Sequence, residues 1–324
     1  MKILITGATG FIGRNVLKEL YQKKNDITAI VRTKTPEKKL LKIKDKVNLV
    51  EIDLADIKRL KEYLSKNSFD LIMHIGALRG GRKFDKKTFI KVNIDATEQL
   101  LLNAKENSSK FIFCSSVGVF GAIPSELPAN ELTPRNPDNT YHFTKIESEK
   151  LIQKYSLRGV KAYIVRPAIT YGKGDYGFPF TLVKLIDKKM LPISLKRTKI
   201  HLTNVELLAS AFKKLSESDF PTGSTFIVAD YEPVDFWDLV NFISNKINNS
   251  NYPVSRFIHP KYFDWGERIS KFFHSELWLS RFELISKSWY YDVNDSYEKL
   301  NLKKIQTIPE FKVVIDWYKS LKGE

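Results

Sequence analysis

A glycine pattern near the start of the chain limits the possible folds more than any other feature of the sequence. Gly7, Gly10 and Gly13 follow directly on the first apolar run, KILIT at residues 2–6, and apolar residues then recur at helical spacing over residues 12–20. Such a turn lets the backbone approach a diphosphate, and the start of the helix offers it unpaired N–H groups. A strand, a glycine turn and a helix in this order predict a dinucleotide-binding unit.

The first half of the chain alternates short apolar runs with helical patterns. Runs of five or six residues that are rich in β-branched side chains indicate strands buried on both faces, as in a parallel sheet. The helices between them serve as right-handed crossovers, so the predicted fold class is α/β with a doubly wound parallel sheet, a Rossmann fold. The predicted strands are residues 2–6, 27–31, 47–52, 71–75, 110–115 and 161–165, and the predicted helices include 56–66, 92–104 and 141–155.

After Pro167 the pattern changes to a glycine-rich loop at 171–177 and to longer helical stretches. Strands become fewer, and aromatic residues become dense between Tyr252 and Tyr291. We therefore expect a dinucleotide-binding Rossmann lobe over residues 1–167 and a smaller C-terminal substrate-binding lobe over 168–324, with segments that can interleave. In the second half the sequence predicts a strand at 224–229 and helices at 204–217, 235–247, 267–285 and 308–320.

The formal net charge of +16 makes nucleic acid and anionic membranes candidate partners. The lysines, however, are scattered along the whole chain, whereas nucleic-acid readers use clustered arginines with aromatic platforms. The composition therefore predicts a lysine-rich surface that favours anionic small molecules, with no nucleic-acid and no membrane partner. The single cysteine, Cys114, excludes an internal disulfide, and no apolar run approaches the roughly 20 residues that cross a bilayer. The expected location is cytoplasmic.

The end of the second predicted strand bears on the choice of cofactor. A chain that prefers NAD carries an acidic residue there, which binds the ribose 2′-hydroxyl. Here the strand runs into Val31, Arg32, Thr33 and Lys34. A guanidinium favours a 2′-phosphate through charge-assisted hydrogen bonds. The sequence therefore predicts NADP, with NAD as the other possibility and an ordinary exposed side chain as the alternative interpretation of Arg32.

Further motifs resemble the extended short-chain dehydrogenase/reductases, the family that includes nucleotide-sugar epimerases and reductases. The resemblance runs along nearly the whole chain and implies NAD(P)-dependent chemistry on a Rossmann fold. The motifs that carry it are the glycine turn, Asp53-Leu54, His74-Ile75-Gly76-Ala77, Val92-Asn93, Ser115 to Gly121, Tyr141-x-x-x-Lys145, Val165-Arg166-Pro167 and the closing segment from Trp289 to Leu302.

The resemblance also implies which residues bind the cofactor. It places Asp53 against the adenine, the region of Ala77 against the nicotinamide ribose and Lys145 on the ribose hydroxyls, and it gives Asn93 a role in organising the site. Helices that begin near Phe89 and Tyr141 commonly form a dimer interface in this family, so a homodimer is expected by analogy. The expected cofactor-binding residues are Gly7, Thr9, Gly10, Phe11, Ile12, Gly13, Arg32, Asp53, Leu54, Gly76, Ala77, Asn93, Tyr141, Lys145 and Pro167.

The Tyr-x-x-x-Lys motif occurs twice, at Tyr141/Lys145 and at Tyr318/Lys322. Tyr141 is distinguished by its position 25 residues after Ser116, at the head of a helix that follows the fifth strand. A tyrosine with its ordinary pKa of about 10 is a poor base at neutral pH, but a lysine cation one helical turn away favours the phenolate. We therefore expect Tyr141 to act as a general acid/base, with Lys145 lowering its pKa and Ser116 orienting the reacting oxygen.

Two basic positions favour a phosphate-bearing substrate. Arg197 lies four residues before His201, in a stretch that resembles the one in which an arginine of nucleotide-sugar enzymes meets the diphosphate. Arg79 begins a basic stretch, residues 79–83, which follows the fourth strand at the rim of the predicted site. Arg79, Ser116 and Arg197 are therefore the expected substrate-binding residues. Basic surface loops are the alternative interpretation of both arginines.

Other residues limit the class of reaction. The family's 4,6-dehydratases carry Thr-Asp-Glu where this chain has Ser116-Val117-Gly118, so dehydration is not expected. His142 and His201 lack a partner at a useful spacing, and no cluster of His, Cys and Asp predicts a metal site. The leading hypothesis is an NAD(P)-dependent oxidoreductase that reduces or epimerises a nucleotide-linked sugar.

Two alternatives stay open at this point. The closing segment also resembles hydroxysteroid-dehydrogenase-like and flavonol-reductase-like relatives, which act on apolar alcohols or ketones. A non-catalytic nucleotide-binding protein is the third hypothesis, against which the intact Ser116, Tyr141 and Lys145 set argues.

Overall fold

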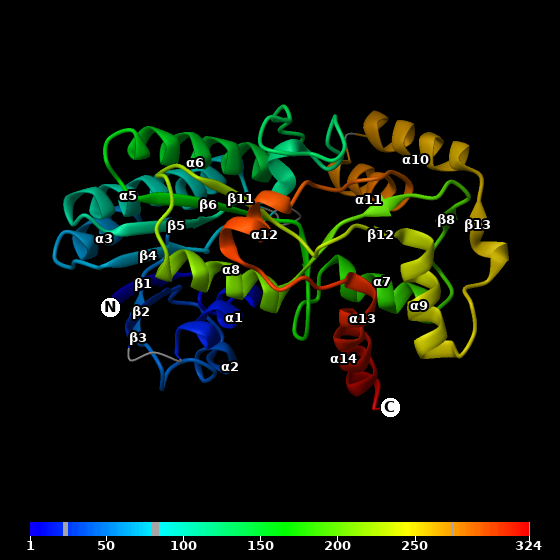
Figure 1. Cartoon of the computed structure of the whole chain (residues 1–324), viewed down its shortest axis with the longest axis horizontal. Coiled ribbons are helices and arrows are strands. Elements are labelled where there is room, and N and C mark those ends of the chain that lie inside the picture. Colours follow the sequence, from blue (N-terminus) through cyan, green and yellow to red (C-terminus); the bar gives the residue numbers. More distant parts are fainter. Residues whose placement is uncertain (22–24, 80–83, 274, 324) are drawn as a thin grey trace.

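The computed structural model describes residues 1–21, 25–79, 84–273 and 275–323. Its centre is a seven-stranded parallel sheet in the order β11-β6-β5-β4-β1-β2-β3 (Figure 1). The predicted doubly wound α/β fold is confirmed. The strands are β1 Lys2–Thr6, β2 Asp26–Val31, β3 Asn48–Glu51, β4 Leu71–His74, β5 Lys110–Cys114, β6 Ala162–Pro167 and β11 Thr225–Val228.

Helices cover both faces of this sheet, because successive residues of each strand point to opposite faces and both sets are apolar. Ile3 and Ile5 of β1 pack with α1 and α8, whereas Leu4 packs with α3, α5 and α6 on the other face. Figure 1 shows these two layers below and above the sheet. The covering helices are α1 Phe11–Leu20, α3 Ile57–Leu64, α5 Ala96–Glu106, α6 Thr140–Ser156 and α8 Val205–Glu217.

The chain order of the strands reverses beside β1, because β2 and β3 extend the sheet on one side and β4, β5 and β6 extend it on the other. In an open α/β sheet, ligands bind outside the carboxyl ends of the strands at such a reversal. The short helices that lie between these strands are α2 Glu37–Leu40, α4 Lys86–Ile90, a π-helix at Lys91–Asp95 and a 3₁₀ turn at Val117–Phe120.

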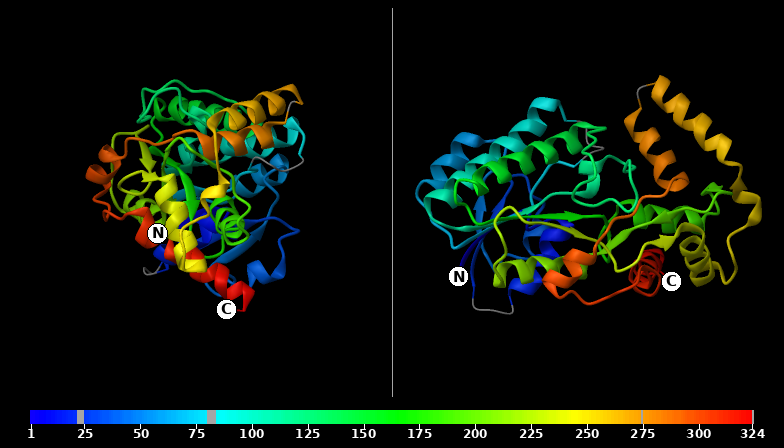
Figure 2. Two further views of the ribbon diagram at one scale, coloured as in Figure 1. Left: turned by 90° about the vertical axis from the view of Figure 1, so that its right-hand side faces the viewer. Right: turned by 45° about the horizontal axis from the view of Figure 1, so that its top comes forward.

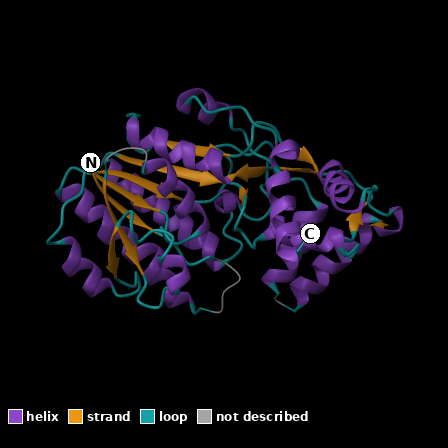
Figure 3. Cartoon of the chain, turned by 90° about the horizontal axis from the view of Figure 1, so that it is seen from below, coloured by secondary structure: helices purple, strands orange, loops and turns teal. Residues whose placement is uncertain are grey.

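The rest of the chain forms a mainly helical lobe at the carboxyl ends of the strands. Figure 3 shows the sheet toward one end of the molecule and these helices toward the other. The short strands pair two by two, β10 with β7, β12 with β9 and β13 with β8. The elements are β7 Ile169–Tyr171, α7 Phe178–Asp187, β8 Ile193–Ser194, β9 Lys199–Ile200, β10 Leu202–Asn204, β12 Val234–Asp235, α9 Phe236–Asn248, β13 Phe257–Ile258, α10 Pro260–Phe272, α11 Glu276–Ser286, α12 Asn294–Leu300, α13 Thr307–Glu310 and α14 Lys312–Lys322.

The single helix predicted over residues 267–285 is wrong. The structure has two helices there, α10 and α11, which fold back on each other as a hairpin (Figure 2). Neither glycine nor proline stands in the sequence between the end of α10 at Phe272 and the start of α11 at Glu276, so the sequence pattern runs on without a break. Helix α7 was also not predicted. Within the described part of the chain, no helix combines the length and the apolar character needed to cross a lipid bilayer.

Candidate active site

A cleft of about 1410 Å³ opens at the carboxyl ends of the main-sheet strands, where the strand order reverses. It brings together almost all residues that the sequence singled out. The predicted residues that line it are Gly7, Thr9, Gly10, Phe11, Ile12, Gly13, Arg32, Asp53, Leu54, Gly76, Ala77, Arg79, Ser116, Tyr141, Lys145 and Pro167. Asn93 and Arg197 are not part of its lining.

The glycine turn packs so closely that side chains would not fit. Gly7 has a positive φ of 75°, and a Cβ there would lie 2.6 Å from the backbone nitrogen of Gly76. A Cβ on Gly13 would lie 2.2 Å from the Gly7 carbonyl oxygen. Helix α1 begins after Gly10, and no side chain caps it. The N–H groups of its first turn therefore have no side-chain acceptor and face the cleft. This arrangement fits the diphosphate of a dinucleotide.

A buried hydrogen-bonded chain holds the floor of the cleft beside this turn. The Thr97 hydroxyl donates to the Asn93 carbonyl at 2.6 Å, so it accepts from His74 Nε2, which lies 2.9 Å away. His74 Nδ1 then accepts from the Thr6 hydroxyl at 2.6 Å, and Thr6 Oγ1 accepts the Gly76 N–H at 3.0 Å. Burial lowers the pKa of His74 to about 3, so the ring stays neutral and supports Gly76 rather than acting as an acid.

Asn93 does not line the cleft, which corrects its assignment as a cofactor contact. Its side chain is buried and bonds both the N–H and the carbonyl of Leu78, at 2.8 and 3.0 Å, as well as Thr144 Oγ1 at 2.9 Å. Asn93 lies in the π-helix, and such turns are frequent at functional sites because they re-aim side chains. It therefore fixes the loop after β4 and the start of α6 from behind the site.

The end of the cleft near β2 is strongly basic. Arg32, Lys38, Lys39, Lys42 and Lys46 all line it and are all exposed. The nearby carboxylate of Asp53 also lines the cleft and accepts the Ala55 N–H at 2.9 Å. Five cations around one end of a cleft attract an anionic group there.

The three predicted catalytic residues lie together on the wall formed by β5 and α6. Ser116 follows β5, and its Oγ accepts the Gly118 N–H at 3.0 Å. Tyr141 is the second residue of α6. Burial raises the pKa of Tyr141 above its ordinary value, and the charge of Arg79 and the Ser116 side chain lower it only in part. The phenol is therefore protonated at neutral pH in the protein alone.

Lys145 lies one helical turn after Tyr141 and lines the same cleft. Its Nζ donates to the Cys114 carbonyl at 2.6 Å and lies 5.9 Å from the ring centroid of Tyr141. Burial lowers the pKa of Lys145 to about 8. In the protein alone, the cost of burying a phenolate exceeds the favourable charge effects, so the pKa of Tyr141 stays raised. Lys145 also holds the end of β5 close to Tyr141, and its lowering of the Tyr141 pKa stays a prediction.

Directly behind Ser116 lies a buried ionic network that the sequence did not reveal. Arg166 donates to Glu149 through Nε at 2.8 Å and through Nη2 at 2.6 Å, and the Ser115 hydroxyl donates to the same carboxylate at 2.6 Å. Arg166 and Glu149 are 2% and 6% exposed. An arginine within a strand that is otherwise apolar is the one signal that could have indicated a buried carboxylate partner.

His142 has a partner, contrary to the sequence interpretation. Its Nδ1 forms a short contact with the Asp138 carboxylate four residues earlier. The ring packs on Gly118, where a Cβ would lie 2.3 Å from His142 Nε2. Gly118 is therefore required at this position, since a side chain would displace the histidine next to Tyr141.

The two arginines predicted to bind substrate lie in different places. Arg79 lines the cleft, where its charge acts on both Tyr141 and Asp175. Arg197 lies outside, with 57% of its side chain exposed, and its Nη2 is 2.9 Å from the Asp238 carboxylate. Residues 80–83 of the predicted basic stretch lie outside the described residues.

The sequence is similar to one family of known proteins. The sequence pattern of the NAD dependent epimerase/dehydratase family matches residues 3–205. An uncharacterized protein of Saccharomyces cerevisiae is 28% identical over 179 residues, which cover 55% of this chain and 57% of that protein. A UDP-glucose 4-epimerase of Lactobacillus helveticus is 30% identical over 155 residues, which cover 47% of this chain and 46% of the relative. The matched segment thus spans about half the length of these relatives.

A solved structure extends the similarity of fold to the whole chain. The UDP-glucuronic acid 4-epimerase from Bacillus cereus, in complex with NAD, superposes with a TM-score of 0.77. The alignment covers 99% of both chains at 19% sequence identity.

Proposed function

Because the chain belongs to the NAD-dependent epimerase/dehydratase family, we propose that it is an NAD(P)-dependent oxidoreductase that reduces or epimerises a nucleotide-linked sugar. One observation carries this proposal. Ser116, Tyr141 and Lys145 line the same cleft as the glycine turn. A dinucleotide whose diphosphate lies on that turn would therefore extend toward these three side chains.

The protein's own residues perform the proton chemistry in this proposal. A bound nicotinamide supplies the hydride acceptor or donor. Tyr141 gives its proton to a substrate carbonyl oxygen during reduction and takes it back from the hydroxyl during oxidation. The Ser116 hydroxyl bonds the same oxygen and holds it against the phenol. Lys145, fixed on the Cys114 carbonyl, keeps a cation on the ribose side of the cleft and so favours the phenolate when Tyr141 has lost its proton.

The basic end of the cleft supports NADP as the preferred cofactor. NADP(H) should bind about ten- to a hundredfold tighter than NAD(H), because a charge-assisted bond to the 2′-phosphate is worth roughly 1.5–3 kcal/mol. Arg32→Ala should narrow this difference without erasing it, since Lys38 and Lys42 line the same region. Isothermal titration with both cofactors measures the effect, and Lys66→Ala, an exposed residue beyond α3, is the control. A wild-type preference for NAD(H) would contradict the role of Arg32 and favour an epimerase that recycles its own hydride.

We further propose that Arg197 binds the diphosphate of the substrate after releasing Asp238. Arg197→Ala should raise KM roughly tenfold with kcat little changed, because the interaction is made equally in the ground and transition states. Asp238→Asn serves as the matched variant, since it removes the nearer of the two carboxylates beside Arg197, with Asp235 remaining at 3.7 Å, and should leave KM the same or lower it. Steady-state kinetics with an active nucleotide sugar measure both. An unchanged KM in Arg197→Ala would favour an apolar alcohol as the substrate.

The direct test of the proposed function is cofactor oxidation and reduction with a panel of nucleotide sugars, their 4-keto forms and steroid or flavonoid alcohols. Turnover with the nucleotide-linked compounds supports the proposal. Turnover with apolar alcohols alone would contradict the substrate class, and cofactor binding without any turnover would favour a non-catalytic nucleotide-binding protein. A homodimer through the helical stretch that begins near Phe89 and the helix that begins near Tyr141 stays a prediction; these segments pack against each other on one face of the sheet.

A further inference from the structure

The helical hairpin α10–α11 has no part in the proposed reaction. The two helices pack on each other at the edge of the C-terminal lobe, well apart from the main sheet (Figure 2). No described residue of either helix lines the cofactor cleft. Gly266 allows them to approach closely, since a Cβ there would lie only 2.9 Å from the ring of Phe282.

One face of α10 exposes a stripe of large apolar side chains. They recur mostly at intervals of three or four residues and therefore share one face of the helix. Trp265 is 65% exposed and Phe272 is 77% exposed, while Phe263, Glu267 and Ser270 on the opposite face are buried. The stripe consists of Tyr262, Trp265, Ile269, Phe272 and Phe273.

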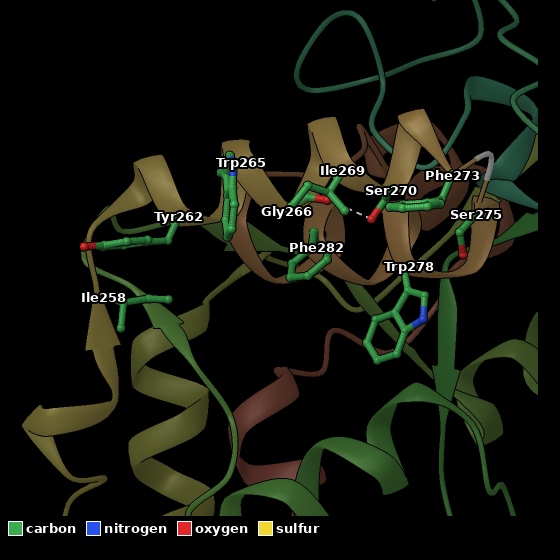
Figure 4. Close-up of a pocket in the computed structure, with 10 residues that line it drawn as sticks. All are labelled: Ile258, Tyr262, Trp265, Gly266, Ile269, Ser270, Phe273, Ser275, Trp278 and Phe282. Carbon is green, nitrogen blue, oxygen red and sulfur yellow. Dashed lines mark hydrogen bonds between the residues drawn. The ribbon is translucent and has the colours of Figure 1, made fainter.

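The stripe borders a groove of about 770 Å³ between the two helices (Figure 4). Trp265 and Ile269 contribute one wall, and Trp278 and Phe282 of α11 contribute the other. Its described lining residues carry few polar side-chain groups, namely the hydroxyls of Tyr262, Ser270 and Ser275 and the indole N–H groups of Trp265 and Trp278. Ser270 Oγ already donates to the Gly266 carbonyl at 2.8 Å.

A groove of this kind suits hydrocarbon better than protein. An extended polypeptide that entered it would bury backbone N–H and C=O groups without partners, which is costly. An acyl chain has no such groups.

Basic side chains surround the apolar surface. Lys261 Nζ lies 5.3 Å from the ring centroid of Tyr262, and the Arg281 guanidinium lies 4.9 Å from the ring of Trp278. Arg268 and Lys271 are exposed as well. Asp264 is the only exposed acidic residue among the described side chains of the two helices.

The other acidic side chains of the hairpin that the structure describes are neutralised. Glu267 is buried and lies 2.7 Å from Lys287 Nζ, and Glu283 lies 3.2 Å from the same group. Among the described side chains, the outward charge of the hairpin is therefore positive, in keeping with the net charge of +16 of the whole chain.

We propose that the α10–α11 hairpin binds the surface of a membrane that contains anionic lipids. Indole, phenol and phenyl rings partition into the boundary between head groups and acyl chains, and flanking lysines and arginines attract lipid phosphates. The apolar groove accepts acyl chains. This contact is peripheral, so it needs no spanning helix, and none of the described helices could provide one. A second copy fits less well, because an isologous contact would bring the same basic flank of both copies together.

Vesicle flotation of the full-length protein tests the proposal. The protein should float with vesicles of phosphatidylcholine and phosphatidylglycerol, less with phosphatidylcholine alone, and less at high salt. The double variant Trp265→Ala, Trp278→Ala should lower partitioning by about tenfold or more, because both exposed indoles are lost. The control is Leu132→Ala, Leu157→Ala, which removes two side chains that are each 91% exposed outside the hairpin.

Tryptophan fluorescence gives an independent measurement. The chain has five tryptophans, of which Trp289 and Trp317 are buried and Trp237 is half-buried. Lipids with brominated chains should quench the wild-type emission and leave that of the double variant nearly unchanged, with circular dichroism confirming that the variant is folded.

Three outcomes would overturn the proposal. The first is no flotation with either vesicle, and the second is flotation that the double variant leaves unchanged. The third is a dimer in solution that the double variant dissociates, without any binding to vesicles, which would assign the surface to a second copy of the chain.

Discussion

Tyr141→Phe should lower kcat by at least about 100-fold while leaving cofactor affinity nearly unchanged. The variant keeps the ring and its packing but removes the proton that the substrate oxygen receives, and a positioned proton transfer contributes about 10²–10⁴ in rate. Because reduction and oxidation share the same proton transfer at Tyr141, its loss should affect both directions alike. Steady-state kinetics and a cofactor titration measure the two effects separately.

Tyr155→Phe provides the matched control. Tyr155 lies on the same helix and is buried, whereas Tyr141 is half-buried and lines the cleft. The Tyr155 hydroxyl donates to Glu98 at 3.4 Å and does not line the cleft. This variant should retain wild-type kcat. Near-normal turnover of Tyr141→Phe, or an equal loss in both variants, would contradict the assignment of Tyr141 as the acid/base.

Glu149→Ala should destabilise the protein by about 3–5 kcal/mol, since it leaves a buried guanidinium without its counter-charge. Arg166 is 2% exposed, and both of its hydrogen bonds to a carboxylate end on Glu149. The Ser115 hydroxyl loses its acceptor in the same substitution. Urea unfolding followed by circular dichroism measures the change, with the slope checked against the wild type.

Glu147 is the natural comparison because it lies two residues away on the same helix but forms an exposed pair with Lys150 at 2.7 Å. Glu147→Ala should cost no more than about 1 kcal/mol. If the two substitutions cost the same, the buried network does not support the strand end that carries Ser116.

The main sheet could be predicted from the sequence because pattern and environment agree there. Its central strands are buried on both faces, so each of them has a continuous apolar sequence, whereas the edge strand β3 includes the exposed residues Asn48 and Glu51. The residues of the cleft could also be predicted, because they follow the carboxyl ends of parallel strands, which all lie at one edge of the sheet. Residues as far apart as Gly7, Ser116 and Pro167 therefore line one site.

What could not be predicted depends on contacts between distant segments. Asn93 faces inward because a π-turn rotates it toward Leu78, and no periodicity shows such a turn in advance. The ion pair of Glu149 with Arg166 joins α6 to β6. The chain has 37 acidic residues, and the sequence alone does not show which of them pairs with Arg166. The hairpin of α10 and α11 escaped prediction because its reversal carries no residue that breaks a helix.

The position of β11 has a consequence for how the molecule forms during synthesis. This strand pairs with β6 at the edge of the main sheet, and α8, which precedes it, packs on α1 from the beginning of the chain. The half that carries the glycine turn is therefore incomplete until translation has passed Val228. Before that point β6 has a bare edge, which is a template for pairing with other chains. The contacts between α1 and α8 join segments nearly two hundred residues apart in the sequence. Such contacts slow folding, because a long loop must close before they form. A nascent chain of this protein therefore depends on its later segments, or on chaperones, to protect the earlier ones.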